Sequence, residues 1–165
     1  AGSESYDYTF QKPVWIGGAT LWLGDFGLSG DGTMFNTTFA DYRDPAKTYF
    51  SQNTAMFDAL AKYRFDRGFY NVFAGYRGIG APNAHFGTAG VGMERPLIGG
   101  WLWLNAKAQG GHDFRSSYFA DGRAGLGLRL WALEIDGGFR HFAYQNAAEP
   151  MFHLNGPILE AKLAF

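Results

Sequence analysis

The residues best suited to acid–base chemistry in this chain are its four histidines, His85, His112, His141 and His153. His112 and Asp113 precede Ser116 and Ser117, so one short segment holds the three residue types of a hydrolase triad. A triad needs hydrogen bonds between its members, and closeness in sequence does not supply that geometry. We therefore keep His112, Asp113 and Ser116 as catalytic candidates and favour their interpretation as ordinary polar loop residues.

No metal or cofactor site is expected from the spacing of these side chains. His141 and His153 can approach each other across the last predicted hairpin loop, but no third histidine or carboxylate has a spacing that completes a site. The chain has no cysteine, which leaves no disulfide or thiolate ligand. Its net charge of −1 argues against a nucleic-acid partner.

The elements that must position these residues show a period of two. Charged residues make up only 18% of the chain, and apolar residues alternate with others in segments of about ten residues. This pattern is typical of membrane-barrel strands, and no apolar run is long enough for a transmembrane helix. We predict an all-β fold, a closed antiparallel transmembrane barrel that forms one domain over residues 1–165. Its eight strands are predicted at 14–24, 54–65, 69–79, 86–95, 100–109, 122–131, 133–145 and 153–165.

The predicted connections alternate between short and long. Short turns are expected at 66–68, at 95–99 and near 131–133, and longer loops at 25–53, 80–85, 110–121 and 146–152. Short periplasmic turns and long extracellular loops are the outer-membrane pattern. With eight strands, both termini lie on the short-turn side, so 1–13 is predicted to be a periplasmic segment that follows a removed signal peptide.

Within each of four predicted strands the charged residues share one parity. Arg123 and Arg129 occupy odd positions, for example, while Leu126 and Leu128 occupy even positions. A lipid-facing Arg or Lys costs about 2–4 kcal/mol, so the apolar parity is expected to face lipid. The residues expected there are Ala59, Tyr63, Val72, Ala74, Val91, Leu102, Leu104, Leu126, Leu128, Ile135, Leu159 and Leu163.

A water-soluble barrel is the structural alternative, with the leucines inside and the charges outside. Three features favour the membrane interpretation: tryptophans near predicted strand ends, glycines on the polar face, and the terminal aromatic Phe165. Trp101 and Trp103 fit the first feature least well, because their parity points them inward.

The inward parity predicts a polar network in the lumen. An eight-stranded barrel has an interior just filled by side chains, so we expect an occluded lumen. Glu134 and Asp136 are expected to accept hydrogen bonds from Arg123, Arg129 or Arg140, because a buried charge requires a partner. The alternative is a narrow gated pore, with anions favoured because eight basic residues face five acidic ones. The predicted network comprises Arg64, Glu94, Arg123, Arg129, Glu134, Asp136, Arg140 and Glu160, and the count also includes Lys62, Arg77, Lys107, Lys162 and Asp58.

The first predicted loop, 25–53, is long and rich in aromatic residues, which is unlike a disordered segment. One interpretation is a strand extension above the membrane, since 33–41 alternates. The other is a partner-binding surface for a protein or glycan, formed by Phe35, Phe39, Tyr42, Arg43 and Tyr49.

The C-terminus, Phe165 behind Leu159, Ala161 and Leu163, resembles the signal that the outer-membrane barrel-assembly machinery reads. The whole layout is similar to the small eight-stranded outer-membrane proteins of Gram-negative cells, which include anchors, adhesins and lipid A-modifying enzymes. The resemblance implies an outer-membrane location, with membrane lipids such as lipopolysaccharide and the assembly machinery as partners.

The segment 140–148 also resembles the lipid A 3-O-deacylase family, which has His-x-Ser-Asn-Ala there. With Asn146 and Ala147 aligned, Ala143 replaces the histidine and Gln145 the serine, and neither can act as base or nucleophile. We therefore predict a non-enzymatic barrel, without a cofactor, that acts through its extracellular loops on a protein, glycan or lipid partner, or in envelope structure. A lipid A-modifying hydrolase is the alternative, and a narrow gated pore the second alternative.

Overall fold

The computed structural model describes residues 5–9, 14–40, 49–80, 83–146 and 149–164, and β-strands are its only regular elements over these ranges. No helix among the described residues is long and apolar enough to span a membrane. The strands are β1 (Ser5–Thr9), β2 (Val14–Leu23), β3 (Phe26–Ala40), β4 (Tyr49–Phe65), β5 (Tyr70–Gly80), β6 (Asn83–Ile98), β7 (Leu102–His112), β8 (Tyr118–Leu130), β9 (Leu133–Asn146) and β10 (Glu149–Ala164).

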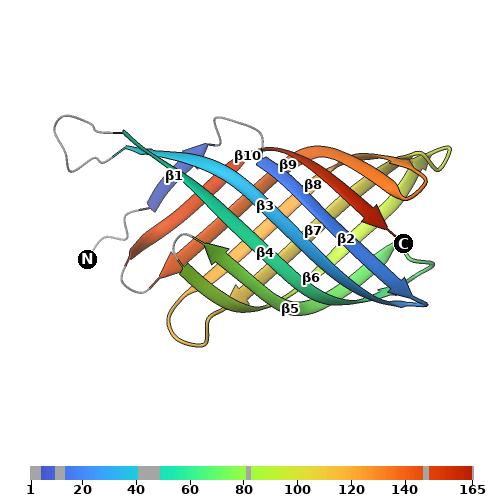
Figure 1. Cartoon of the computed structure of the whole chain (residues 1–165), viewed down its shortest axis with the longest axis horizontal. Helices are drawn as coiled ribbons and strands as arrows, with labels where there is room; N and C mark the ends of the chain where they lie inside the picture. Colours follow the sequence, from blue (N-terminus) through green and yellow to red (C-terminus); the bar gives the residue numbers. More distant parts are fainter. Residues whose placement is uncertain (1–4, 10–13, 41–48, 81–82, 147–148, 165) are drawn as a thin grey trace.

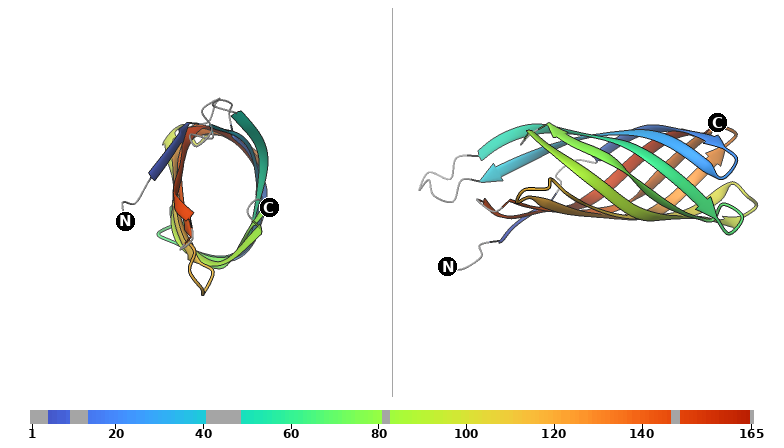
Figure 2. Two further views of the ribbon diagram at one scale, coloured as in Figure 1. Left: turned by 90° about the vertical axis from the view of Figure 1, so that its left-hand side faces the viewer. Right: turned by 90° about the horizontal axis from the view of Figure 1, so that it is seen from below.

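Strands β2 to β10 close into a barrel of nine strands, each inclined to the long axis (Figure 1). Neighbouring strands are antiparallel except at the closure, where β2 runs parallel to β10 with Val14 opposite Ile158 and Thr20 opposite Ala164. The short β1 pairs with an earlier part of β10, also in parallel. The view along the axis shows a closed ring with an oval outline (Figure 2). The prediction of an all-β closed barrel is thus confirmed.

The prediction of eight strands is wrong, because residues 26–40 form a strand where the sequence predicts a loop. In a nine-stranded meander the first and last strands run in the same direction, so the closure has to be parallel. The N-terminal strands therefore start at one end of the barrel while β10 finishes at the other (Figure 1). The expectation that both termini share the short-turn side is also wrong, and β1 lies beside residues 151–155, far from the tight turns.

Four tight turns lie at one end of the barrel, which we call the turn end; the opposite end is the loop end. They join β2 to β3, β4 to β5, β6 to β7 and β8 to β9. The turn after β4 places Asp66, Arg67 and Gly68 at φ of 50°, 58° and 85°. Such left-handed conformations are easiest for glycine and tolerated by aspartate, and they let two strands reverse within a few residues.

Along strands β2 to β10, the side chains that the structure describes alternate between the outside and the inside of the barrel. The residues predicted to form the apolar face all lie outside: Leu126 is 50% exposed and Val91 56%, and Leu102, Leu104 and Leu159 are half-buried on the same face. Most of the leucines therefore lie outside, with Leu60 and Leu154 inside, and every Asp, Glu, Lys and Arg described on the strands except Arg95 faces the lumen.

Candidate functional site

The lumen contains most of the charged side chains of the described strands. The net charge of these side chains is close to zero, whereas the sequence predicts an excess of three positive charges. The difference comes from Asp31, in the segment interpreted as a loop, and Asp121, one residue before a predicted strand. The inward charged residues are eight basic, Lys62, Arg64, Arg77, Lys107, Arg123, Arg129, Arg140 and Lys162, and seven acidic, Asp31, Asp58, Glu94, Asp121, Glu134, Asp136 and Glu160.

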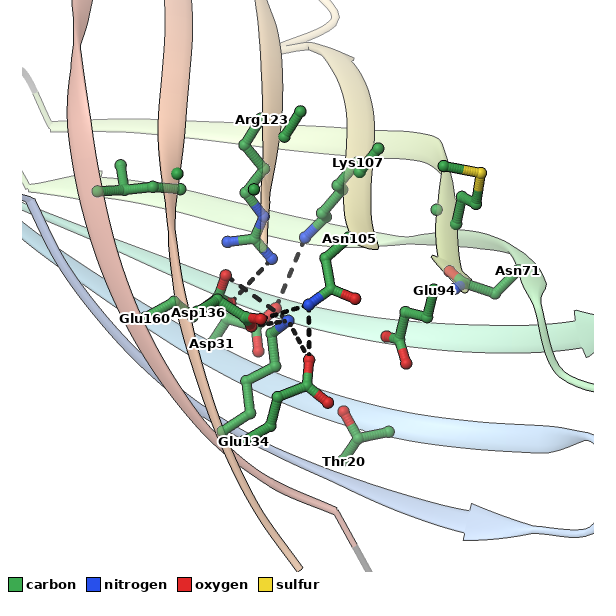
Figure 3. Close-up of a pocket in the computed structure, with 18 of the residues that line it drawn as sticks. Thr20, Asp31, Asn71, Glu94, Asn105, Lys107, Arg123, Glu134, Asp136 and Glu160 are labelled. Carbon is green, nitrogen blue, oxygen red and sulfur yellow. Dashed lines mark hydrogen bonds and ion pairs between the residues drawn. The ribbon is translucent and has the colours of Figure 1, made fainter. Parts of the chain in front are cut away.

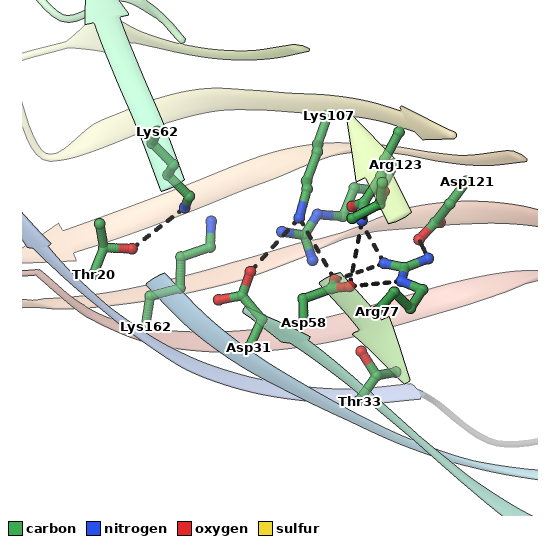
Figure 4. Close-up of polar contacts among 12 residues, drawn as sticks. Thr20, Asp31, Thr33, Asp58, Lys62, Arg77, Lys107, Asp121, Arg123 and Lys162 are labelled. Atoms are coloured by element: carbon green, nitrogen blue, oxygen red, sulfur yellow. Dashed lines mark hydrogen bonds and ion pairs between the residues drawn. The ribbon is translucent and has the colours of Figure 1, made fainter. Parts of the chain in front are cut away.

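A belt of ion pairs crosses the middle of the lumen. Arg77 donates from Nε to Asp58 Oδ1 at 2.7 Å and from Nη1 to Asp121 Oδ2 at 2.7 Å (Figure 4). Arg140 donates from Nε to the other oxygen of Asp121, also at 2.7 Å. Both arginines are only 2% exposed. Buried charges at this depth are tolerated because each guanidinium has a carboxylate partner within hydrogen-bond distance.

A second network lies closer to the turn end. Arg129 donates to Glu134 at 2.7 Å, as the sequence predicted, and it also contacts Glu94 at 3.1 Å. The other predicted pairings differ, because Asp136 accepts from Lys162 at 2.9 Å and Asn105 bridges Glu134 and Asp136 (Figure 3). The remaining predicted members pair elsewhere: Arg123 with Glu160 at 3.0 Å, Arg140 with Asp121, and Arg64 with Asp25 at 3.6 Å near the turn end.

A small polar cavity separates side chains of this second network. Its volume is about 70 Å³, and Asp31, Lys107, Arg123 and Glu160 lie on its wall (Figure 3). With the described residues Lys107 makes two long ion pairs there, 3.6 Å to Asp31 and 3.9 Å to Asp58. A space of this size accommodates a few water molecules. It is too small for a lipid or glycan ligand.

The loop end of the lumen is filled by an apolar plug. Its rings pack closely, with 5.1 Å between the ring centroids of Phe86 and Phe119 and 6.0 Å between those of Phe119 and Phe142. The guanidinium carbon of Arg77 lies 4.6 Å from the centroid of Phe119, so the plug rests directly on the ion-pair belt. The plug comprises Val14, Ile16, Met56, Ile79, Phe86, Phe119, Phe142, Tyr144, Leu154 and Ile158.

The catalytic candidates lie together at the loop end, but they are not arranged as a triad. The backbone N–H of Phe114 donates to His112 Nδ1 at 2.7 Å, so the proton of the neutral ring is on Nε2 and no basic nitrogen is left for a serine. Asp113 Oδ1 accepts from the backbone amides of Ser116 and Ser117, both at 3.0 Å. These carboxylate contacts form a turn, and no hydrogen bond joins His112 to Asp113 or to a serine hydroxyl among the described residues.

The positions that replace the deacylase residues have structural partners. Ala143 lies between Ala120 of β8 and His153 of β10 in the sheet. The hydroxyl of Tyr118 donates to Gln145 Oε1. Neither position places a nucleophile or a base at the loop end.

The predicted partner-binding loop is largely a β-ribbon. β3 pairs with β2 only up to Met34, and β4 pairs with β5 only from Met56. Beyond these points β3 and β4 continue to pair with each other as far as Ala40 and Tyr49, so they extend past their neighbours β2 and β5 (Figure 1). Phe35 and Phe39 are therefore strand residues, Tyr49 begins β4, and Tyr42 and Arg43 lie outside the described residues. The strand extension is the interpretation that the structure supports.

Comparisons of this chain with protein-family models, with curated proteins and with solved structures gave no match. The geometry of the barrel is therefore the basis for any assignment of function.

Proposed function

We propose that this chain is an outer-membrane β-barrel with a closed lumen, which acts through its loop end by binding a protein, glycan or lipid partner or as an anchor in the envelope. One observation carries the proposal, the separation of charge between the two faces. Among the described side chains that face outward from the strands, Arg95 is the only acidic or basic one apart from histidines. It lies near the turn end. The inward positions hold eight basic and seven acidic residues.

The outer surface suits a lipid environment. Leu28, Leu126 and Leu128 are 63%, 50% and 47% exposed, and these side chains belong to a band that surrounds the barrel. Soluble monomers rarely expose contiguous apolar patches beyond a few hundred Å². Exposed aromatic residues also gather near the turn end, as at a membrane–water interface, and they include Phe26, Tyr63, Phe65, Trp101 and Trp131.

The membrane assignment is tested by folding the purified chain into phospholipid vesicles and following its heat-modifiable migration on gels. We expect a compact band that converts to the unfolded position on boiling, and recovery of the protein from cells in the outer-membrane fraction. Recovery in a soluble fraction without lipid or detergent would contradict the proposal.

The filled lumen argues against the pore alternative. The apolar plug closes the loop end, and the ion-pair belt beneath it contains arginines that are only 2% exposed. In planar bilayers the protein is expected to give no stable single-channel conductance. Reproducible conductance steps from the folded protein would show that a path exists.

The hydrolase alternative lacks a catalytic arrangement, because His112 and Asp113 both accept hydrogen bonds from the backbone. The test is mass spectrometry of lipid A from cells with and without the protein, for which we expect identical acylation. An altered acylation pattern that disappears in His112→Ala or Ser116→Ala would overturn the non-enzymatic assignment.

A binding role is supported by the projecting β3–β4 ribbon, which leads to the mixed aromatic and charged segment 41–48. Replacing 41–48 with a two-residue Asn-Gly turn is expected to keep the barrel and remove partners from a pulldown, since Asn-Gly favours a tight hairpin. Arg67→Ala, at the turn end, is the matched control and should retain them. Partners that survive the loop replacement would place the binding surface elsewhere.

A further inference from the structure

Two histidines lie side by side on the outer surface, and neither the lumen nor the proposed binding role uses them. His141 of β9 and His153 of β10 have ring centroids 5.6 Å apart, with 36° between the ring planes. In the sheet His141 is opposite Asn155, and His153 is opposite Ala143, so the two histidines form a diagonal cross-strand pair.

A neighbouring amide sets the tautomer of the His141 ring. His141 Nδ1 and Asn155 Oδ1 form a hydrogen bond, and because an amide oxygen only accepts, Nδ1 is the donor. The neutral ring of His141 therefore has its lone pair on Nε2. Metal-binding histidines are commonly oriented in this way, with one ring nitrogen donating to an oxygen and the other binding the ion.

The spacing of the two rings suits a shared metal ion. Zinc–nitrogen bonds are about 2.0–2.1 Å long, so two imidazoles on one tetrahedral ion have ring centroids about 5 Å apart. The observed 5.6 Å differs from that value by less than about 1 Å. The neighbours are also small: Gly122 is opposite His141 on β8, with no atom within 4 Å of its would-be Cβ, and Ala143 is opposite His153.

We propose that His141 and His153 form a two-histidine site for a transition-metal ion that prefers imidazole, with Zn²⁺ as the representative ion and Asn155 as the orienting residue. The described residues contain no set of three histidines, aspartates, glutamates or cysteines that could hold an ion. Among the described residues the site therefore has two protein ligands, with water in the open positions, and it is expected to bind more weakly than a four-ligand structural zinc site. It would place a metal ion on the outer surface where the apolar band gives way to polar residues.

The test is calorimetric titration of ZnCl₂ into the untagged, folded protein in detergent near neutral pH. We expect one Zn²⁺ per chain, loss of this binding in His141→Ala and in His153→Ala, and affinity about 10–100-fold lower in Asn155→Ala. His85→Ala and His112→Ala are matched controls, because these outward histidines are not part of the pair, and they should bind as the unmodified protein does.

All variants are compared only after each shows the heat-modifiable band of the folded barrel, and His141→Gln and His153→Gln replace the alanine variants if those fail to fold. Absence of zinc binding by the unmodified protein would overturn the proposal. So would binding that survives loss of both histidines, or that depends equally on His85 or His112.

Discussion

Arg77 of β5 and Asp121 of β8 meet across the lumen, with Arg77 Nη1 2.7 Å from Asp121 Oδ2. Strands β6 and β7 separate them in the wall, so this contact connects parts of the barrel that the backbone hydrogen bonds do not join directly. Asp121 also binds Arg140, so one carboxylate contacts two buried guanidinium groups, and Asp58 supplies the second negative charge. The ion-pair belt therefore fills and stabilises the interior of this barrel, as apolar side chains do in the core of a soluble protein.

Removing this carboxylate is expected to be strongly destabilising. Among the described residues, Asp121→Ala leaves Arg140 without a carboxylate partner and Arg77 with Asp58 alone. We therefore expect a loss of about 3–5 kcal/mol in the free energy of unfolding. Glu94→Ala is the matched control and should cost less than about 1 kcal/mol, because its partner Arg129 is partly exposed and keeps Glu134. Urea unfolding in vesicles measures both. Equal costs would show that the belt does not hold the barrel together.

Two adjacent glycines of β9 should respond differently to alanine. A Cβ on the inward Gly138 would lie 2.3 Å from the carbonyl oxygen of Ala124 and 2.7 Å from Gly125 Cα, whereas one on the outward Gly137 would have no atom within 4 Å. We expect Gly138→Ala to cost about 1–3 kcal/mol through overpacking. Gly137→Ala should be neutral or stabilising, by up to about 1 kcal/mol. Similar unfolding midpoints for both variants would contradict the close approach of β8 and β9.

The parallel closure can be trapped with a disulfide, because the natural chain has no cysteine. Ala19 and Leu163 are register partners across β2 and β10, and both face outward. Paired strands lie about 4.8 Å apart, so Ala19→Cys with Leu163→Cys should form a disulfide under mild oxidation. Ala19→Cys with Leu159→Cys is displaced by four residues, about 13 Å, and should not. The opposite result on non-reducing gels would refute the nine-stranded closure.

The loop after β7 should keep its turn at low pH. Hydrogen bonds from the backbone amides of Ser117, Arg115 and Ser116 lower the pKa of Asp113 below its ordinary value. Because the pKa of the Asp113 carboxyl is lowered in the folded protein, the ionised carboxylate stabilises the turn fully above about pH 4. This stabilisation is lost only as the pH falls through the lowered pKa. The carbon-13 shift of the Asp113 carboxyl, followed by NMR in micelles, should still report an ionised group at pH 3. Titration near pH 4 would contradict these hydrogen bonds.

The sequence was sufficient to predict the two faces of the barrel but not the number of strands. In β3 the inward positions carry Gly27, Ser29, Asp31 and Thr33, and two of the outward positions are glycines, so the contrast between the faces is weak. The single charge Asp31, with Leu28 and Met34 on the other parity, was the available signal. The parallel closure follows from the odd number of strands. Because the sequence pattern does not reveal β3, it also predicts the N-terminal segment at the wrong end of the barrel.

Pairing within the lumen was less predictable than its composition. Arg129 and Glu134 lie five residues apart across one hairpin, and their contact follows from local register. Arg77 and Asp121 lie 44 residues apart on strands that do not pair, so their contact depends on the strand stagger around the whole barrel. The alternation along each strand predicts which side chains face the lumen. It does not predict how far along the barrel axis each of them lies.

The most direct test of the membrane assignment is Leu126→Arg, compared with Gln145→Arg in the same vesicles. Leu126 faces outward on β8, four residues from the end of the strand, and is 50% exposed, whereas Gln145 faces outward near the loop end. If lipid surrounds the barrel, Leu126→Arg should lower the free energy of unfolding by about 2–4 kcal/mol, and Gln145→Arg by no more than about 1 kcal/mol. If water surrounds it, both substitutions should stay within about 0.5 kcal/mol of the unmodified protein, and the central claim would be wrong.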